Sequence, residues 1–66
     1  GERMKIIENN KENMILSFSR DEVLILKNSL NEVYNGINIE DWEFLTRMGC
    51  DRKEASELLE QLYKLI

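Results

Sequence analysis

Carboxylates are the side chains of this chain that could do chemistry. Glu40, Asp41 and Glu43 are close neighbours in the sequence, and Glu32 precedes them. A hydrolytic pair needs two acids that converge on a cleft from different environments. Three of these acids share one short predicted helix, and no set of nucleophile, base and oxyanion donors accompanies them. We therefore expect no enzymatic activity and no cofactor.

Cysteine and histidine, the residues of sulfur and imidazole chemistry, are even scarcer. The 66 residues include one cysteine and no histidine, which excludes an internal disulfide and the usual zinc-binding sets. Cys50 follows Gly49 and precedes a predicted helix, but a nucleophilic thiol needs a supporting base. We interpret Cys50 as a small apolar residue at a helix boundary, and we expect no metal site.

Charge is distributed unevenly along the chain. The net charge is −4, and residues 21–43 carry six acids against the single cation Lys27, a net charge of −5. Such a segment would repel phosphate backbones and attract a basic protein. An alternative interpretation is a solvated helix face that keeps a small protein soluble.

The longest periodic segment, residues 18–37, predicts a helix. Ser19 and Glu22 have the spacing of a capping box, and Gly36 fits a left-handed residue that ends the helix. Apolar residues recur at spacings of three and four, which marks one buried face. This stripe consists of Val23, Leu26, Leu30, Val33 and Ile37, flanked by Tyr34.

Leu24 and Ile25 lie off that stripe. One interpretation is that the first turn of the helix lies between two other elements and is covered on both sides. The other is that Ile25 contacts another chain.

Two short apolar segments at the start of the chain, residues 4–8 and 14–18, predict a β-hairpin around the polar run 9–13. Residues 14, 16 and 18 should face the core, and we expect the first helix to pack across the hairpin. An alternative is a single strand, with the segment before Met14 disordered. A two-stranded ribbon has free edges, which suggests a homodimer formed through the hairpin edge.

Two further helices follow. Residues 40–48 should form a short helix that Gly49 ends, with an ion pair between Glu43 and Arg47. Its expected apolar side is Trp42, Leu45 and Met48, broadened by Phe44, and we expect the aromatic residues Trp42, Phe44, Tyr34 and Tyr63 to lie in the core.

Asp51, with Glu54 three residues later, predicts the start of the last helix, which should run to the end of the chain. Its expected core stripe is Ala55, Leu58, Leu59, Leu62 and Ile66. The predicted fold is therefore α+β with the order ββααα, in one domain over residues 1–66. We interpret residues 1–3 as a remnant that precedes a native start at Met4.

Residues 44–62 resemble a helix-turn-helix unit, with a short helix, a glycine-containing turn and a capped second helix. The resemblance implies a DNA-binding role for residues 51–66, where the second helix would enter the major groove. Here that helix offers Arg52 and Lys53, followed by Glu54, Glu57 and Glu60. These acids do not favour nucleic acid as a partner.

The pattern from Leu30 to Gly49, with Asn31-Glu32-Val33, Trp42-Glu43-Phe44 and Thr46-Arg47-Met48 within it, is similar to small uncharacterised bacterial proteins, some of the immunity-protein type. This resemblance implies a role in binding and masking a basic toxin surface.

The function predicted from the sequence is a non-enzymatic protein-interaction domain of immunity or antitoxin type, which presents an acidic helical surface to a basic protein. The alternatives are a helix-turn-helix DNA-binding protein and a self-associating structural module. We expect a cytoplasmic, bacterial-type protein with no membrane association. The predicted partner-binding residues are Ile25, Glu32, Glu40, Asp41, Glu43, Thr46 and Arg47.

Overall fold

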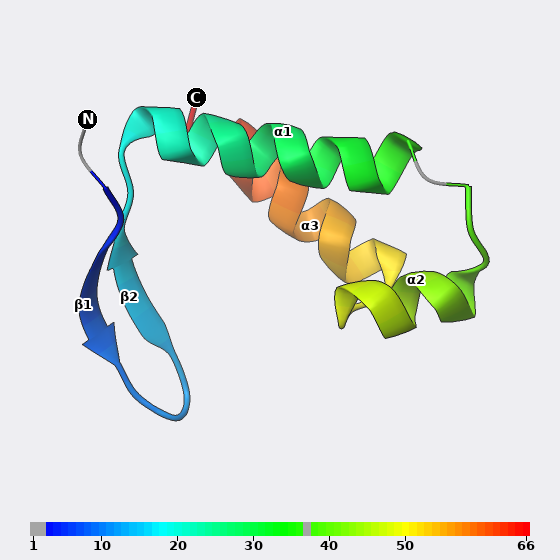
Figure 1. The fold of residues 1–66 in the computed structure, drawn as a ribbon, viewed down its shortest axis with the longest axis horizontal. Coiled ribbons are helices and arrows are strands. Elements are labelled where there is room, and N and C mark those ends of the chain that lie inside the picture. Colours follow the sequence, from blue (N-terminus) through cyan, green and yellow to red (C-terminus); the bar gives the residue numbers. More distant parts are fainter. Residues whose placement is uncertain (1–2, 37) are drawn as a thin grey trace.

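The chain folds into a β-hairpin followed by three helices, which confirms the predicted α+β order. The computed structural model describes residues 3–36 and 38–66. Figure 1 shows the hairpin at one end of α1 and α2 near its other end, with α3 running between them. The elements are β1 (Lys5–Asn9), β2 (Met14–Ser17), α1 (Arg20–Gly36), α2 (Asp41–Met48) and α3 (Arg52–Tyr63).

The hairpin forms because a polar turn joins two strands rich in apolar residues. The Asn10 side-chain oxygen accepts the backbone N–H groups of Glu12 and Asn13, each at 3.0 Å. This turn chemistry is typical of asparagine, whose side chain mimics a backbone acceptor. The strands are antiparallel, with a bulge in β1 between Ile6 and Glu8.

The first turn of α1 has the predicted capping box. The Glu22 N–H donates to the Ser19 hydroxyl at 3.1 Å, and the Ser19 N–H donates to the Glu22 carboxylate at 3.0 Å. The prediction of a left-handed Gly36 is wrong, because this residue continues the helix without a positive φ. Ile37, which was assigned to the apolar stripe, lies outside the described residues.

The hairpin does not pack under α1, so that prediction is wrong. In the described part of the chain, α1 contacts α3 and α3 contacts α2, whereas β1 and β2 contact only each other. The half-buried stripe residues Val23, Leu30 and Val33 fit this packing against α3. Leu24 and Ile25 remain exposed, so the interpretation of a first turn covered on both sides is also wrong.

The buried residues of the described chain belong to α2 and α3. Phe44 of α2 is fully buried, and Ala55 and Leu59 of α3 are also buried. Trp42 and Leu45, which the sequence placed on the apolar side of α2, are 68% and 52% exposed. The predicted buried side is therefore wrong for these two residues, whereas the expected burial of Phe44 is confirmed. A helix of eight residues has too few turns to fix that direction from spacing alone.

The end of α2 and the start of α3 follow the sequence. Gly49 has a φ of 74°, and its N–H donates to the Leu45 carbonyl at 2.9 Å. Because few residues other than glycine adopt this left-handed conformation, the stop at Gly49 is confirmed. The Glu54 N–H donates to the Asp51 carboxylate at 2.8 Å, which confirms the second cap.

Parts of the predicted core are solvent-exposed. Helix α3 ends at Tyr63 rather than at the last residue. Leu58 and Tyr63 were assigned to the core but remain about half exposed, and Ile66 lies beyond the helix. The burial that was expected around the hairpin, α1 and α3 is therefore limited, among the described residues, to residues of α2 and α3.

Candidate partner-binding surface

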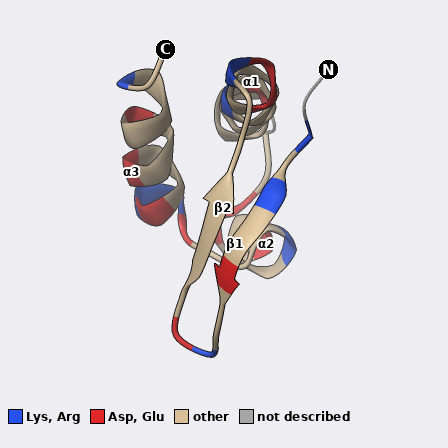
Figure 2. Ribbon diagram, turned by 90° about the vertical axis from the view of Figure 1, so that its left-hand side faces the viewer, with Lys and Arg blue, Asp and Glu red and all other residues tan. Residues whose placement is uncertain are grey.

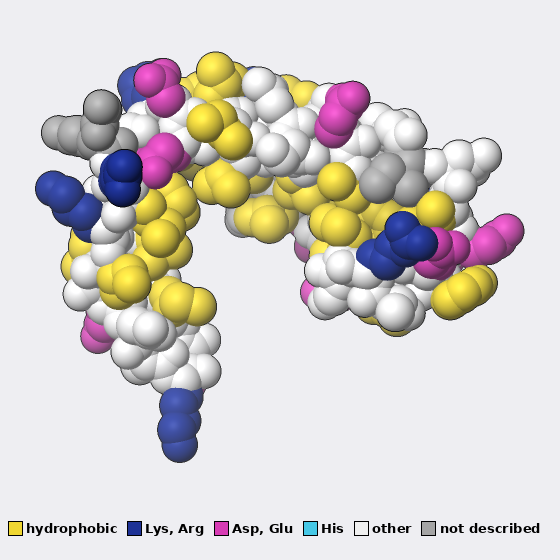
Figure 3. All heavy atoms as spheres, viewed as in Figure 1, with side chains coloured by type: hydrophobic (Ala, Val, Ile, Leu, Met, Phe, Trp, Pro, Cys, Tyr) yellow, Lys and Arg dark blue, Asp and Glu magenta, His cyan; other side chains and the backbone are white. Residues whose placement is uncertain are grey.

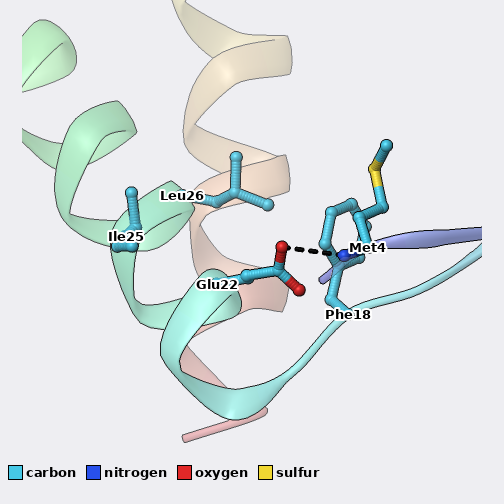
Figure 4. A pocket seen from close by; sticks show the side chains of 5 residues that line it. All are labelled: Met4, Phe18, Glu22, Ile25 and Leu26. Atoms are coloured by element: carbon cyan, nitrogen blue, oxygen red, sulfur yellow. Dashed lines mark hydrogen bonds between the residues drawn. The ribbon is translucent and has the colours of Figure 1, made fainter. Parts of the chain in front are cut away.

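The described residues form an open apolar pocket in the corner between the hairpin and α1. It has a volume of about 330 Å³ and is lined by Met4, Phe18, Glu22, Ile25 and Leu26. Figure 4 shows Phe18 and Met4 entering from the hairpin side, and Ile25 and Leu26 from α1. We refer to these five residues as the corner pocket.

Glu22 ties the base of the hairpin to α1. One oxygen of its carboxylate accepts the Ser19 N–H, and the other accepts the Met4 N–H at 2.9 Å, the bond drawn in Figure 4. The backbone hydrogen bond from Ser19 lowers the pKa of Glu22 most, with further lowering from Met4, and burial opposes them. The carboxylate is therefore held in its charged form while it bridges the two elements.

Ile25 is the predicted partner-binding residue that the structure places in a pocket. Its side chain is 63% exposed and lies on the α1 side of the corner pocket. Exposed apolar residues that share a concave surface are typical of interaction sites, whereas scattered ones need no explanation. Leu26 and Phe18 are also exposed and extend the apolar surface next to Ile25.

The acids predicted in α2 are partly paired within the chain. Glu43 forms the predicted ion pair with Arg47 at 2.7 Å, and Asp41 pairs with Arg52 at 3.0 Å. Asp41 is almost fully exposed in its pair, so that pair adds little stability. The pairs nevertheless lower the net negative charge that α2 presents to a partner.

Glu40 and Thr46, two other predicted residues, form local hydrogen bonds in and next to α2. Glu40 precedes α2 as its N-cap, but its side chain makes no capping bond, and its carbonyl accepts the Phe44 N–H at 3.0 Å. The Thr46 hydroxyl donates to the Trp42 carbonyl at 2.9 Å. Glu32 is exposed on α1.

The structure divides the predicted site between two places. Ile25 lies in the part of α1 next to the hairpin, whereas Asp41, Glu43, Thr46 and Arg47 belong to α2 near the other end of α1 (Figure 1). Figure 2 shows acidic residues on all three helices and on the hairpin. The predicted acids of α2, Asp41 and Glu43, therefore do not gather with Ile25 around the corner pocket.

Arg52 is an organising residue that the sequence interpretation did not single out. Its guanidinium donates to the Ile39 carbonyl at 2.6 Å and lies over the Phe44 ring, 4.6 Å from the ring centre. It also donates to Asp41. A cation in the first turn of a helix opposes the helix dipole. That unfavourable position is the signal in the sequence that could have pointed to a tertiary role.

A second polar cluster joins α1 to α3. The Tyr63 hydroxyl donates to the Asn31 side-chain oxygen at 3.1 Å, and the Lys27 ammonium lies 5.0 Å from the centre of the Tyr63 ring. Asn35 also donates to the Asn31 oxygen at 2.8 Å. These contacts fix the crossing of the two helices, and they leave the corner pocket uncovered.

Other kinds of site are not formed by the described residues. Over residues 3–36 and 38–66 no group of three or more acidic or cysteine side chains could hold a metal ion. Cys50 is half-buried and forms no disulfide. No helix within these residues has the length and apolar character needed to cross a bilayer.

Comparisons with protein-family models, with curated proteins and with solved structures found no significant match.

Proposed function

We propose that this chain is a non-enzymatic protein-interaction domain that binds a basic protein, in the manner of an immunity or antitoxin protein. The corner pocket receives an apolar side chain of the partner, and acids along α1 attract its basic residues. The proposal rests on the position of Ile25, an exposed apolar side chain in an open pocket within the most acidic segment of the chain.

Charge complementarity favours a basic partner. Residues 21–43 have a net charge of −5, and such a potential raises the rate of encounter with a cationic surface. Because Asp41 and Glu43 pair with arginines of the same chain, we assign the attraction mainly to acids outside those pairs. Asp21 and Glu32 are exposed on α1 and fulfil this condition.

Helix α3 supplies little that would favour DNA binding over this proposal. Arg52, the arginine at its start, is engaged with the Ile39 carbonyl, with Asp41 and with the Phe44 ring. The helix then presents the exposed acids Glu54, Glu57 and Glu60. Phosphate contacts dominate affinity for nucleic acids, and this surface would weaken them.

The test is affinity capture from the cells that make the protein, at low salt, followed by titration calorimetry with the purified partner. We expect a basic protein whose affinity falls at least about tenfold with Ile25→Asp, as for a central interface residue. Glu32→Gln should weaken binding less and reduce its salt dependence. The matched control is Leu58→Asp, a similarly exposed leucine of α3 outside the corner pocket, and it should bind like the wild type.

Capture of a protein supports the proposal only with this pattern of variants. If no protein is captured at low salt, or if Ile25→Asp binds as tightly as the wild type, the proposed function is wrong. Circular dichroism of each variant must first show a wild-type melting profile, so that loss of binding does not merely report unfolding.

A further inference from the structure

A hairpin of this size is at best marginally stable on its own. Its two strands have five and four residues, and in the described part of the chain they contact only each other. An isolated two-stranded hairpin is marginally stable at best in water, and independent stability needs more strands or a covering helix. The bond from Met4 to Glu22 attaches the base of the hairpin and covers neither of its faces.

One face of the hairpin is apolar and uncovered. Ile6 and Leu16 are register partners, so their side chains lie on the same face. Met4 and Phe18, two residues further towards the base on each strand, line the corner pocket. Figure 3 shows hydrophobic side chains on the side of the hairpin that faces the hollow beneath α1. This apolar face therefore lies on the side of the hairpin where α1 is located.

The two edges of the hairpin differ in how well they could pair with another strand. The β1 edge carries Lys5 and Glu8 and is interrupted by the bulge between Ile6 and Glu8. Charges and bulges are the features that prevent edge pairing in natural sheets. The β2 edge has neither feature, since residues 13–19 contain no charged side chain and the register irregularity falls in β1.

The accessible surface area of the chain indicates how much surface a second copy could bury. Its accessible surface is 5673 Å², whereas a compact monomer of this mass should expose about 4,400 Å². The radius of gyration is 13.4 Å, against about 11 Å for a compact domain of 66 residues. The excess of about 1,250 Å² per chain, doubled for a pair, falls in the range of obligate homodimers.

We infer that two copies of this chain pair antiparallel through the outer edges of β2 and form one four-stranded sheet with the order β1-β2-β2-β1. Antiparallel neighbours related by a two-fold axis require that axis to stand perpendicular to the sheet. Both apolar faces then lie on the same side of the sheet. The helices of both chains approach from that side, because Ile25 and Leu26 meet the base of each hairpin there.

The charge distribution of the chain favours this contact through β2 over a contact through the helices. A two-fold interface brings each surface patch against its own copy. The segment 21–43, with its net charge of −5, would repel itself. The uncharged β2 edge avoids that repulsion and leaves the acids of α1 accessible to a different partner. The inference therefore stands independently of the proposed function.

The first test is sedimentation velocity over a range of protein concentrations. The wild-type chain should sediment as a dimer, with twice the 7.9 kDa mass of one chain. Ile15→Lys places a charge near the two-fold axis and should raise the dissociation constant of the dimer at least about tenfold. The matched control is Ile7→Lys on β1, an exposed isoleucine of the other strand, which should leave the dimer intact.

A second test does not depend on how well the lysine variants fold. Ile15→Cys in a Cys50→Ser background should form a disulfide-linked dimer on mild oxidation, because the two copies of residue 15 lie close to the axis. Ile7→Cys in the same background should remain a monomer on a non-reducing gel.

Three outcomes would overturn the inference. A wild-type chain that sediments as a monomer at high micromolar concentration would do so, as would equal effects of the two lysine variants. So would a dimer that Ile15→Cys fails to cross-link, because its contact would then lie elsewhere. None of these results bears on whether Ile25 binds a basic protein, so failure here and failure of the proposed function can be told apart.

Discussion

The corner between the hairpin and α1 and the junction between α2 and α3 are built in opposite ways. At the junction, Phe44 is fully buried, and Arg52 at the start of α3 contacts the Ile39 carbonyl before α2 as well as Asp41 and Phe44 of α2. At the corner, a Glu22 carboxylate makes well-formed hydrogen bonds, but the apolar residues around it remain exposed. Both regions have well-formed polar contacts, but only the junction has a fully buried apolar side chain.

This difference separates the part of the chain that folds on itself from the part that needs another surface. A chain of 66 residues has little apolar area to bury, and its buried described residues belong to α2 and α3. Exposed apolar residues at the corner and hairpin then stabilise the protein only when a second molecule covers them. Perturbing each region should therefore give results of different size and kind.

The largest effect is expected for Phe44→Ala. Removing a fully buried phenylalanine costs about 3–5 kcal/mol, a large part of the stability of a small domain. We expect the junction of α2 and α3 to unfold, which chemical denaturation followed by circular dichroism would measure. The control is Trp42→Ala in the same helix, a larger side chain that is mostly exposed. Equal destabilisation by the two variants would show that the junction is not the core.

An intermediate effect is expected for Arg52→Ala. It removes a charged hydrogen bond to the Ile39 carbonyl and the stacking on Phe44, together worth about 1–3 kcal/mol. Lys53→Ala, which removes the exposed neighbouring cation, should change stability by less than about 0.5 kcal/mol. Urea denaturation of both variants measures the difference.

A further variant shows which contact of Arg52 matters. Asp41→Ala removes only the exposed ion pair, so it should cost less than Arg52→Ala. If Asp41→Ala costs as much as Arg52→Ala, the ion pair and not the backbone contact holds the junction together.

Local signals in the sequence predicted the elements well. Ser19 with Glu22, and Asp51 with Glu54, marked the starts of α1 and α3 because their side chains bind backbone groups three residues away. Gly49 marked the end of α2 for a similarly local reason. Such contacts depend on neighbouring residues only, and a single sequence contains all of them.

Packing could not be predicted in the same way. The spacing in α2 favoured Trp42, but the buried residue is Phe44, whose ring lies under the Arg52 guanidinium of α3. The expectation that α1 covers the hairpin failed because the stripe of α1 was matched by α3 instead. The site was predicted only in part, since periodicity marked Ile25 as off the stripe but not its neighbours in the corner pocket.

The smallest effect is expected at the corner, where a change of pH titrates the Glu22 carboxylate. The pKa of Glu22 is lowered in the folded chain from its ordinary value of 4.5, mainly by the Ser19 N–H. A lowered folded pKa means that the charged carboxylate stabilises the fold above about pH 4.5, and that this contribution is lost as the pH falls through the lowered value. Nitrogen–proton correlation spectra from pH 7 to pH 2 should therefore show the Met4 and Ser19 amides shifting together, with one midpoint below 4.5.

Glu22→Gln should abolish this shared transition, because the amide does not titrate, whereas Glu32→Gln on the same helix should leave it unchanged. The amides of α2 and α3 should not follow the same midpoint, since the Glu22 carboxylate accepts, among residues 3–36 and 38–66, the N–H groups of Ser19 and Met4. If the transition survives in Glu22→Gln, another acid controls the corner. If the α3 amides follow it as well, the corner and the junction form one cooperative unit, and the contrast between the two regions does not extend to their stability.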